Sequence, residues 1–318
     1  MVEVYTKTGQ YFKLESIKDI TTNHQDLATI GFQDYTDDDL AWVKSNFHLD
    51  LSIMNHIEDI EISSHFQQNE TQSAFHFSLP YYKQKDVMVE ESMFLILTQN
   101  MVFGFSSSSL DNYFTEIYSH KFDLRKNKFH RVEDLFKFQI EFLADHYADI
   151  TENIARRVKQ LAARVLVKKE FQEADLDIIT QLNFNNILIK ESINEFVRIL
   201  TLQKKSLGSF NINVKDKIDE ELNDLSVVTD YIQFNFDRLD DLKENISNKI
   251  ELEQNKIFKL LTVVTFCISI PTLIAGIYGM NFEVIPGRFS NYGFAVTLVV
   301  MFCSVLIPLV YFKKRKWF

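Results

Sequence analysis

Two long runs without a charged residue lie close together near the end of the chain, at residues 260–282 and 289–312. They contain 23 and 24 residues, and a helix needs about 20 apolar residues to cross a hydrocarbon core of roughly 30 Å. Only six residues separate the two runs, which leaves room for a tight connection and for no folded domain. The sequence therefore predicts a transmembrane hairpin.

The composition of the chain narrows the class of protein. Its 318 residues carry a formal charge of −10 and a pI near 5.3, whereas nucleic-acid binding usually needs a basic face. Both cysteines, Cys267 and Cys303, lie inside the apolar runs and predict no disulfide framework. The first residues lack the apolar segment of a cleavable signal peptide. We therefore expect about the first 250 residues to stay in the cytoplasm and to bind no nucleic acid.

Positive charges at the ends of the hairpin predict its orientation. Lys256 and Lys259 precede the first run, and the basic cluster at residues 313–316 directly follows the second. The connection between the runs carries only Arg288 against Glu283. Because cytoplasmic loops carry the excess of lysine and arginine, both termini are expected in the cytoplasm and the connection outside. This predicts a multi-pass protein of the inner (plasma) membrane.

Before the hairpin, the pattern of the chain changes once, near residue 130. Residues 1–130 alternate strand-like segments with short helix signals and predict an α/β domain whose sheet is covered by helices. The following residues have apolar side chains at helical spacing and contain no proline before Pro271. The predicted domains are a cytoplasmic α/β domain at 1–130, a cytoplasmic helical region with a stalk helix at 131–256, and a transmembrane hairpin at 257–318. Within the hairpin, the first span is expected at about 258–280, the outer loop at 281–290 and the second span at about 291–312, before a basic cytoplasmic tail.

The stalk helix has no turn residue between it and the first span. We predict one continuous helix from about residue 215 to residue 279, which at 1.5 Å per residue is roughly 95 Å long. Apolar residues along it fit a spacing of three to four that Lys243 and Glu253 interrupt: Ile232, Phe236, Leu239, Ile246, Ile250, Ile257 and Leu260. A helix of this length with a partial apolar seam is expected to pack on copies of itself or on neighbouring helices. The pattern favours an oligomer.

The first span carries a polar stripe that a single helix in lipid does not need. Its members follow at intervals of 3, 4, 3, 4 and 3 and so share one face: Thr262, Thr265, Ser269, Thr272, Gly276 and Gly279. Asn255 continues this face beyond Phe258 and Leu261, whose bulky apolar side chains suit a gate. Two interpretations stay open from the residues alone, close packing of helices through small side chains and the lining of a water-filled pore. The second span lacks such a stripe and is expected to be the outer, lipid-facing helix.

Catalytic motifs are missing from the sequence. The eight histidines form no His-Glu-x-x-His arrangement, the cysteines form no Cys-x-x-Cys pair, and no phosphate-binding loop of the Gly-x-x-x-x-Gly-Lys-Ser/Thr type occurs. His65 and His146 are expected to be ordinary surface residues or residues with satisfied hydrogen bonds. We therefore predict that the protein is not an enzyme.

Residues 274–283 have the sequence Ile-Ala-Gly-Ile-Tyr-Gly-Met-Asn-Phe-Glu, which resembles the signature of the CorA magnesium channel family. The similarity continues through residues 253–262 and 311–317, and segments 57–61 and 94–98 look like family segments of the cytoplasmic domain. Gly-Met-Asn alone is a weak signal, but between two C-terminal spans it is specific. The resemblance implies a funnel-shaped homopentamer that conducts Mg²⁺ as its main ion, and also Co²⁺ and Ni²⁺, without a cofactor.

The resemblance also assigns roles to residues. It places the ion-binding selectivity filter at Gly279, Met280 and Asn281. The pore-lining positions that it implies coincide with the polar stripe and its extension: Asn255, Phe258, Leu261, Thr262, Thr265, Ser269, Thr272 and Gly276. One departure is Gly287, beside Arg288, where family members commonly have an acidic residue. This departure predicts a weaker attraction for cations at the mouth.

Mg²⁺ is implied as a regulatory ion as well as the transported one. Carboxylates of adjacent subunits repel one another unless a cation bridges them, so bound intracellular Mg²⁺ is expected to hold the oligomer closed. Glu58 and Asp59 are candidate ligands by resemblance, and Glu220, Glu221 and Asp224 are candidate partners on the long helix. An ordinary solvated face is the alternative for each. For the whole protein, the alternatives are a Zn²⁺ transporter of the same superfamily and a membrane-anchored sensor or scaffold.

Overall fold

The computed structural model forms two compact units, Met1–Leu242 and Lys243–Phe318. It describes residues 1–20, 24–56, 65–84, 86–118, 129, 131–206, 214–281, 283, 285–287 and 289–315.

A mixed sheet forms the centre of the first unit. Within the described residues it has seven strands in the order β2-β1-β3-β7-β6-β5-β4. Strands β3 and β7 pair in parallel, and the other neighbours pair antiparallel. The strands are β1 (Val2–Thr6), β2 (Tyr11–Leu14), β3 (Leu27–Gln33), β4 (Phe66–Gln68), β5 (Gln72–Tyr82), β6 (Met88–Thr98) and β7 (Val102–Ser106). The sheet and its helices bear out the α/β fold expected from the sequence.

One face of the sheet packs against α1 (Asp37–Phe47) and short 3₁₀ turns at Ile17–Asp19, His24–Asp26 and Ser52–His56. Helix α1 begins at a capping box, because the Thr36 hydroxyl accepts from the Asp39 backbone N–H and the Asp39 carboxylate accepts from that of Thr36. Val43 of α1 is fully buried in this core. The α/β pattern near the start of the chain thus follows from ordinary helix-start and strand signals.

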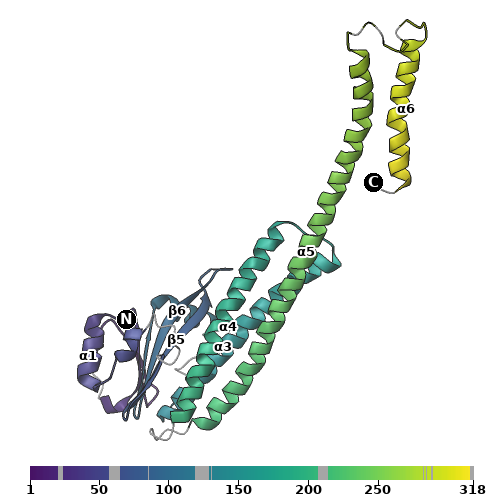
Figure 1. Cartoon of the computed structure of the whole chain (residues 1–318). Helices are drawn as coiled ribbons and strands as arrows, with labels where there is room; N and C mark the ends of the chain where they lie inside the picture. The colour runs from purple at the N-terminus through teal and green to yellow at the C-terminus, as the bar shows by residue number, and fades with distance from the viewer. Residues whose placement is uncertain are drawn as a thin grey trace. The chain divides into compact units, whose positions relative to one another are not determined.

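The other face of the sheet is covered by long helices (Figure 1). These are α3 (Val132–Ala162), which continues into a π-helical turn at Ala163–Val167, and α4 (Ala174–Ser206); the shorter α2 (Ser108–Tyr118) follows β7. Aromatic side chains join the layers: Phe75 packs on Phe136 of α3 with ring centroids 5.3 Å apart, and Phe77 packs on Phe196 of α4 at 5.3 Å. This packing sets the position of α4 along β5.

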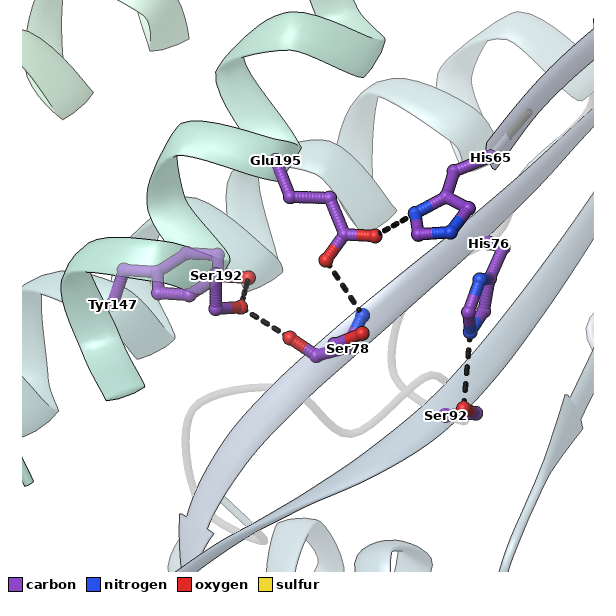
Figure 2. A network of polar contacts seen from close by, with 7 residues as sticks. All are labelled: His65, His76, Ser78, Ser92, Tyr147, Ser192 and Glu195. Carbon is purple, nitrogen blue, oxygen red and sulfur yellow. Dashed lines mark hydrogen bonds and ion pairs between the residues drawn. The ribbon is translucent and has the colours of Figure 1, made fainter. Parts of the chain in front are cut away.

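Strand β4 pairs with β5 only from Ser73 to Phe75. Further along this edge, side chains of the helices form hydrogen bonds with the backbone of β5. Beyond that point, Ser78 donates its backbone N–H to Glu195 at 3.2 Å and accepts from the Ser192 hydroxyl (Figure 2). The Pro80 carbonyl accepts from His146 Nε2 at 2.8 Å. The helices therefore take the place of a neighbouring strand on this edge.

His146 is buried, and both of its ring nitrogens form hydrogen bonds, as expected from the sequence. Its Nε2 donates to Pro80, and its Nδ1 accepts from the Tyr118 hydroxyl at 3.1 Å. Burial lowers the pKa of His146 to about 4, although the Pro80 carbonyl acts in the opposite direction. The residue is a neutral structural group at physiological pH.

Helix α5 (Lys215–Tyr278) runs without a break for 64 residues, which confirms the predicted continuous helix. In the first unit its fully buried residues recur every seven positions, at Ile218, Leu225, Ile232 and Leu239. Glu221 and Asn235 are buried on the same side. A seven-residue repeat is the pattern of a helix packed along its length on other helices.

The second unit is a helical hairpin. It contains the C-terminal part of α5 and α6 (Gly293–Lys314), which lie side by side (Figure 1). In the described part of the chain, α5 and α6 are the two helices long and apolar enough to cross a membrane. The predicted hairpin is therefore present, with its connection between Tyr278 and Gly293.

Candidate functional site

The first span turns one face toward α6. Val263 and Cys267 are buried, and Ile270, Pro271 and Ile274 are half-buried. At about 100° per residue these five positions form a single stripe. Two contacts identify it as the face on α6: the Cys267 Sγ lies 3.9 Å from the Val305 carbonyl, and the rings of Phe266 and Phe312 are 6.1 Å apart.

The polar stripe lies on the opposite face of the same helix. By the same rotation of about 100° per residue, Thr265, Ser269 and Gly276 are each roughly 160–180° from Cys267. Every predicted pore-lining residue is exposed in the single chain: Asn255, Phe258, Leu261, Thr262, Thr265, Ser269, Thr272 and Gly276. Packing against α6 therefore does not explain the stripe. Two explanations of the stripe remain: contact with further copies of the chain, or the lining of a water-filled pore.

Hydroxyl groups on this face donate inward to the helix backbone. Thr262 donates to the Phe258 carbonyl at 2.8 Å, Thr272 donates to the Ile268 carbonyl at 2.8 Å, and Ser269 donates to the Thr265 carbonyl. A hydroxyl has one proton to donate and two lone pairs. Because each hydroxyl proton is donated to a backbone carbonyl, the oxygen lone pairs remain available as hydrogen-bond acceptors. Such a surface suits a cation whose bound waters donate hydrogen bonds.

Several small or polar residues of the second span lie at its half-buried positions. Its half-buried positions recur at three- and four-residue spacing and include Gly293, Thr297, Ser304 and Pro308. The side chains on its other faces are exposed and largely apolar, among them Phe294, Val299, Phe302 and Ile307. This distribution suits a helix whose outer surface meets lipid.

The predicted filter residues lie at the tip of the hairpin, where α5 ends. Gly279 and Met280 continue the helical hydrogen bonding for one turn, with their backbone N–H groups donating to the carbonyls of Ala275 at 2.8 Å and Ile277 at 3.2 Å. Gly279, Met280 and Asn281 are all exposed. The carboxyl end of a helix carries a partial negative charge of roughly −0.5. The tip therefore joins an amide side chain to a helix end that favours cations.

The connection after the filter folds back tightly. The Tyr278 hydroxyl donates to the Pro286 carbonyl at 3.0 Å, and Gly287 has a φ of +82°, which glycine adopts without strain. At Gly293, a Cβ atom would lie 2.1 Å from the Gly287 carbonyl oxygen, so only glycine fits there. These two glycines explain how so short a segment reverses the chain. Arg288 lies outside the described residues.

The structure describes three of the five candidate regulatory residues, Glu220, Glu221 and Asp224. Glu58 and Asp59 lie outside the described residues. On α5, Lys217 contacts Glu221 at 2.7 Å, Glu220 at 3.2 Å and Glu141 of α3 at 3.3 Å. Asp224 is exposed on the same helix. A lysine of the same chain thus already supplies a cation to two of the three candidates.

The Lys217 group also shifts the ionisation of its members. Burial acts to lower the pKa of Lys217, but its hydrogen bonds to Glu221 and Glu220 outweigh that effect and raise it. Burial raises the pKa of Glu221, while the hydrogen bond and the charge of Lys217 oppose the rise. The buried Glu221 therefore depends on Lys217 to remain charged.

A side-chain cluster that the sequence analysis did not anticipate lies at the β5 edge. His65, His76 and Glu195 are all buried, and one potential ligand atom from each lies within 4.8 Å of the others. His65 was expected to be an ordinary surface residue or one with satisfied hydrogen bonds, and it is buried and hydrogen-bonded to Glu195. His65 and His76 meet across one hairpin, whereas Glu195 lies more than a hundred residues further along the chain. The three positions form no known metal-binding spacing.

Comparisons with known proteins place the whole chain in one family. The model of the family described as CorA-like Mg²⁺ transporter protein matches residues 25–314. The magnesium transport protein CorA of Wolinella succinogenes is 28% identical over 323 residues and covers 100% of both chains. That of Campylobacter jejuni is 27% identical over 288 residues, or 88% of each chain.

A solved structure agrees in fold. The complete structure of the CorA magnesium transporter from Methanocaldococcus jannaschii superposes with a TM-score of 0.75 at 17% identity, covering 100% of this chain and 99% of that chain. The α/β domain, the long helix and the C-terminal apolar hairpin are therefore shared along the full length. The chain belongs to the CorA-like Mg²⁺ transporter family.

Proposed function

We propose that the chain assembles into a homopentameric channel that conducts Mg²⁺ into the cytoplasm, with α5 inside and α6 outside. The observation that carries this proposal is the exposed hydroxyl face of α5, which lies opposite its contact with α6. These hydroxyls donate to the helix backbone, but lipid offers no donor for their free lone pairs. A ring of hairpins removes them from lipid and turns them to a shared aqueous axis.

The chemistry of the stripe suits a hydrated ion. Mg²⁺ loses its waters reluctantly and takes oxygen ligands in octahedral geometry. A ring of Asn281 amides, together with Gly279 carbonyls, binds the ion through its water shell at the entrance. Thr262, Thr272 and their neighbours then accept from the same waters. Neutral acceptors hold the ion weakly enough at each position for it to leave again.

The inner end of the stripe supplies the gate. Phe258 and Leu261 are exposed on this face and form an apolar constriction that opens and closes by wetting, with Asn255 as an inner ring beyond them. In this proposal the protein lies in the inner membrane, and both of its termini face the cytoplasm. The membrane potential drives entry, since a divalent ion gains about 4.6 kcal/mol per 100 mV, twice the figure for a unit charge.

Mg²⁺ is the preferred cargo in this proposal. The family model and the curated relatives are named for magnesium, so the Zn²⁺ alternative is not favoured. Co²⁺ and Ni²⁺ are smaller-flux substrates of the same path. A sensor or scaffold function leaves the hydroxyl face of α5 without a purpose.

Intracellular Mg²⁺ also regulates the channel in this proposal. Carboxylates from adjacent subunits, drawn from Glu58, Asp59, Glu220, Glu221 and Asp224, hold the ion and keep the assembly closed. Within one chain, Lys217 is the competing cation for Glu220 and Glu221. The exposed Asp224 has the carboxylate best able to reach a partner across a subunit boundary.

The test of the filter uses two asparagines of the same hairpin. We expect Asn281→Ala to abolish Mg²⁺ uptake into proteoliposomes with an inside-negative potential, while the oligomer stays intact. Asn291→Ala, outside the Gly-Met-Asn motif, is the matched control and should leave uptake near wild type. Unchanged uptake in Asn281→Ala would count directly against the proposal.

A further inference from the structure

A buried group of nitrogen and oxygen ligands lies at the edge of β5, within the first unit. His65 directly precedes β4, and the antiparallel register that pairs Phe66 with Phe75 places His65 opposite His76. The two imidazole rings are 4.5 Å apart at 71°. Cross-strand neighbours of this kind lie within contact distance by geometry alone.

Glu195 completes the group from α4. One carboxylate oxygen pairs with His65 Nδ1, and the other accepts from the Ser78 backbone N–H (Figure 2). The exposed fractions of His65, His76 and Glu195 are only 7%, 1% and 7%. The carboxylate is therefore held in place by the strand and directed at the histidine pair.

Contacts on two sides fix the orientation of the His76 ring, and one of its nitrogens forms no hydrogen bond with the described residues. Its ring stacks on Phe94 at 4.7 Å, and its Nε2 lies 3.0 Å from the Ser92 hydroxyl. Its Nδ1 is buried and has no hydrogen-bond partner among the described residues. Buried polar atoms without a partner are rare and indicate a missing ligand or ion. Here the unpaired atom belongs to a ring that lies against His65.

We propose that His65, His76 and Glu195 form a binding site for a transition-metal dication of the Zn²⁺ class, separate from the Mg²⁺ path. Two imidazoles and one carboxylate are the protein ligands of a known type of zinc site, in which water fills the fourth position. Mg²⁺ prefers oxygen ligands throughout. The donor set therefore selects against the ion that the channel carries.

The surroundings match the needs of such a site. Metal-bound histidines usually donate their other ring N–H to a fixed acceptor, and the Ser92 hydroxyl is in that position for His76. Bonds of about 2.0–2.2 Å in a tetrahedron separate ligand atoms by about 3.4 Å. The ligand atoms now lie within 4.8 Å of one another, so metal binding requires them to approach by up to about 1.4 Å.

The test measures metal binding by the full-length protein in detergent. After treatment with a chelator, Zn²⁺ should bind at one high-affinity equivalent per chain in the presence of excess Mg²⁺. Co²⁺ in its place should give the visible absorption of a low-coordinate site. His76→Phe keeps the stacking on Phe94 and removes the nitrogens, and Glu195→Gln keeps the shape of the carboxylate. Each should weaken Zn²⁺ binding by at least about 100-fold, and Ser92→Ala by about 10-fold.

Two controls separate this site from other histidines and from the pore. His48→Asn changes an exposed histidine whose left-handed backbone asparagine tolerates, and Asn281→Ala changes the filter; both should leave the Zn²⁺ equivalent in place. Circular dichroism of each variant checks folding. The proposal is overturned if folded His76→Phe or Glu195→Gln retains wild-type Zn²⁺ affinity, if Asn281→Ala removes the equivalent, or if wild-type protein binds no Zn²⁺ against excess Mg²⁺. In that last case, the contact between His65 and Glu195 is structural.

Discussion

Replacing Lys217 with methionine tests whether a lysine of the chain itself keeps the buried Glu221 ionised. The Lys217 side chain is 17% exposed and that of Glu221 is 5% exposed, with 2.7 Å between the ammonium and the carboxylate. Methionine keeps the apolar stem of lysine and removes its charge. The other two carboxylates are 49% and 62% exposed, so water screens them after the change. The effect should therefore come mainly from Glu221.

The magnitude follows from the proton that Glu221 then takes up. Without its cation, a buried carboxylate becomes neutral instead of staying charged. Protonating a glutamate of ordinary pKa 4.5 at pH 7 costs about 3.4 kcal/mol, at 1.36 kcal/mol per pH unit. At pH 5 the same step costs about 0.7 kcal/mol. Breaking buried ion pairs typically destabilises proteins by about 3–5 kcal/mol, which agrees with the first figure.

The sign of the pH dependence is fixed by the direction of the shift. In the variant, the pKa of Glu221 is raised above its unfolded value, so above pH 4.5 the folded chain binds more protons than the unfolded chain. The free energy of unfolding then falls as pH rises through this window. The loss relative to wild type should be about 3 kcal/mol at pH 7 and under about 1 kcal/mol at pH 5.

The assay is urea unfolding of the purified full-length protein, followed by circular dichroism at both pH values. Comparing variant with wild type at each pH cancels the titrations that they share. Lys215→Met, an exposed lysine two residues earlier, is the control and should change stability by less than about 0.5 kcal/mol. Adding Glu221→Gln to Lys217→Met should restore most of the stability at pH 7. Equal losses at both pH values, or no recovery in the double variant, would refute the reasoning.

Three further predictions concern other parts of the chain. Leu225→Ala in the buried seam of α5 should lower the free energy of unfolding by about 2–5 kcal/mol, whereas Val227→Ala, at an exposed position, should change it by less than about 0.5 kcal/mol; equal effects would contradict the seam. Gly293→Ala should lower the melting temperature and Mg²⁺ uptake, because its Cβ would lie 2.1 Å from the Gly287 carbonyl oxygen, whereas Gly276→Ala has nothing within 4 Å and should leave the melting temperature unchanged. Limited proteolysis should be slower with Mg²⁺ than without it; identical digestion would argue against a closed state held by a divalent ion.

The transmembrane hairpin and the continuous helix were predictable because their signals are local and long. A run of more than 20 residues without charge has few alternatives to a membrane span. The absence of proline before Pro271 and of turn residues before the first span left nothing to end α5. Both features are determined by residues that are close in the sequence and do not depend on tertiary packing.

Which face of α5 meets α6 was not predictable from periodicity. The spacing of Thr265, Ser269 and Thr272 shows that they share a face, but packing and pore lining use the same spacing. The burial of Cys267 and Val263 assigns the opposite face to α6, so packing on α6 does not account for the polar stripe. That assignment required the partner helix in place.

The histidine cluster was not predictable for a different reason. The pairing of its two histidines depends on a hairpin register, and a local signal for that register is Asn69, whose side chain accepts from the backbone N–H groups of Thr71 and Gln72 at 2.9 Å. Reading that turn would have placed His65 opposite His76. Glu195 arrives from a helix more than a hundred residues away, and no sequence pattern connects it to the strand.

The two ion-related features of the chain differ in hydration, and this difference separates their ions. The α5 stripe offers exposed, neutral oxygen acceptors, which suit an ion that travels inside its water shell. The cluster at β5 offers buried imidazoles, which bind only an ion that exchanges water for nitrogen. Mg²⁺ does not make that exchange readily, so in the two proposals made above it uses the stripe and leaves the cluster unoccupied. In the proposal made above, a Zn²⁺-class ion is the one that the cluster holds, because it readily takes nitrogen ligands.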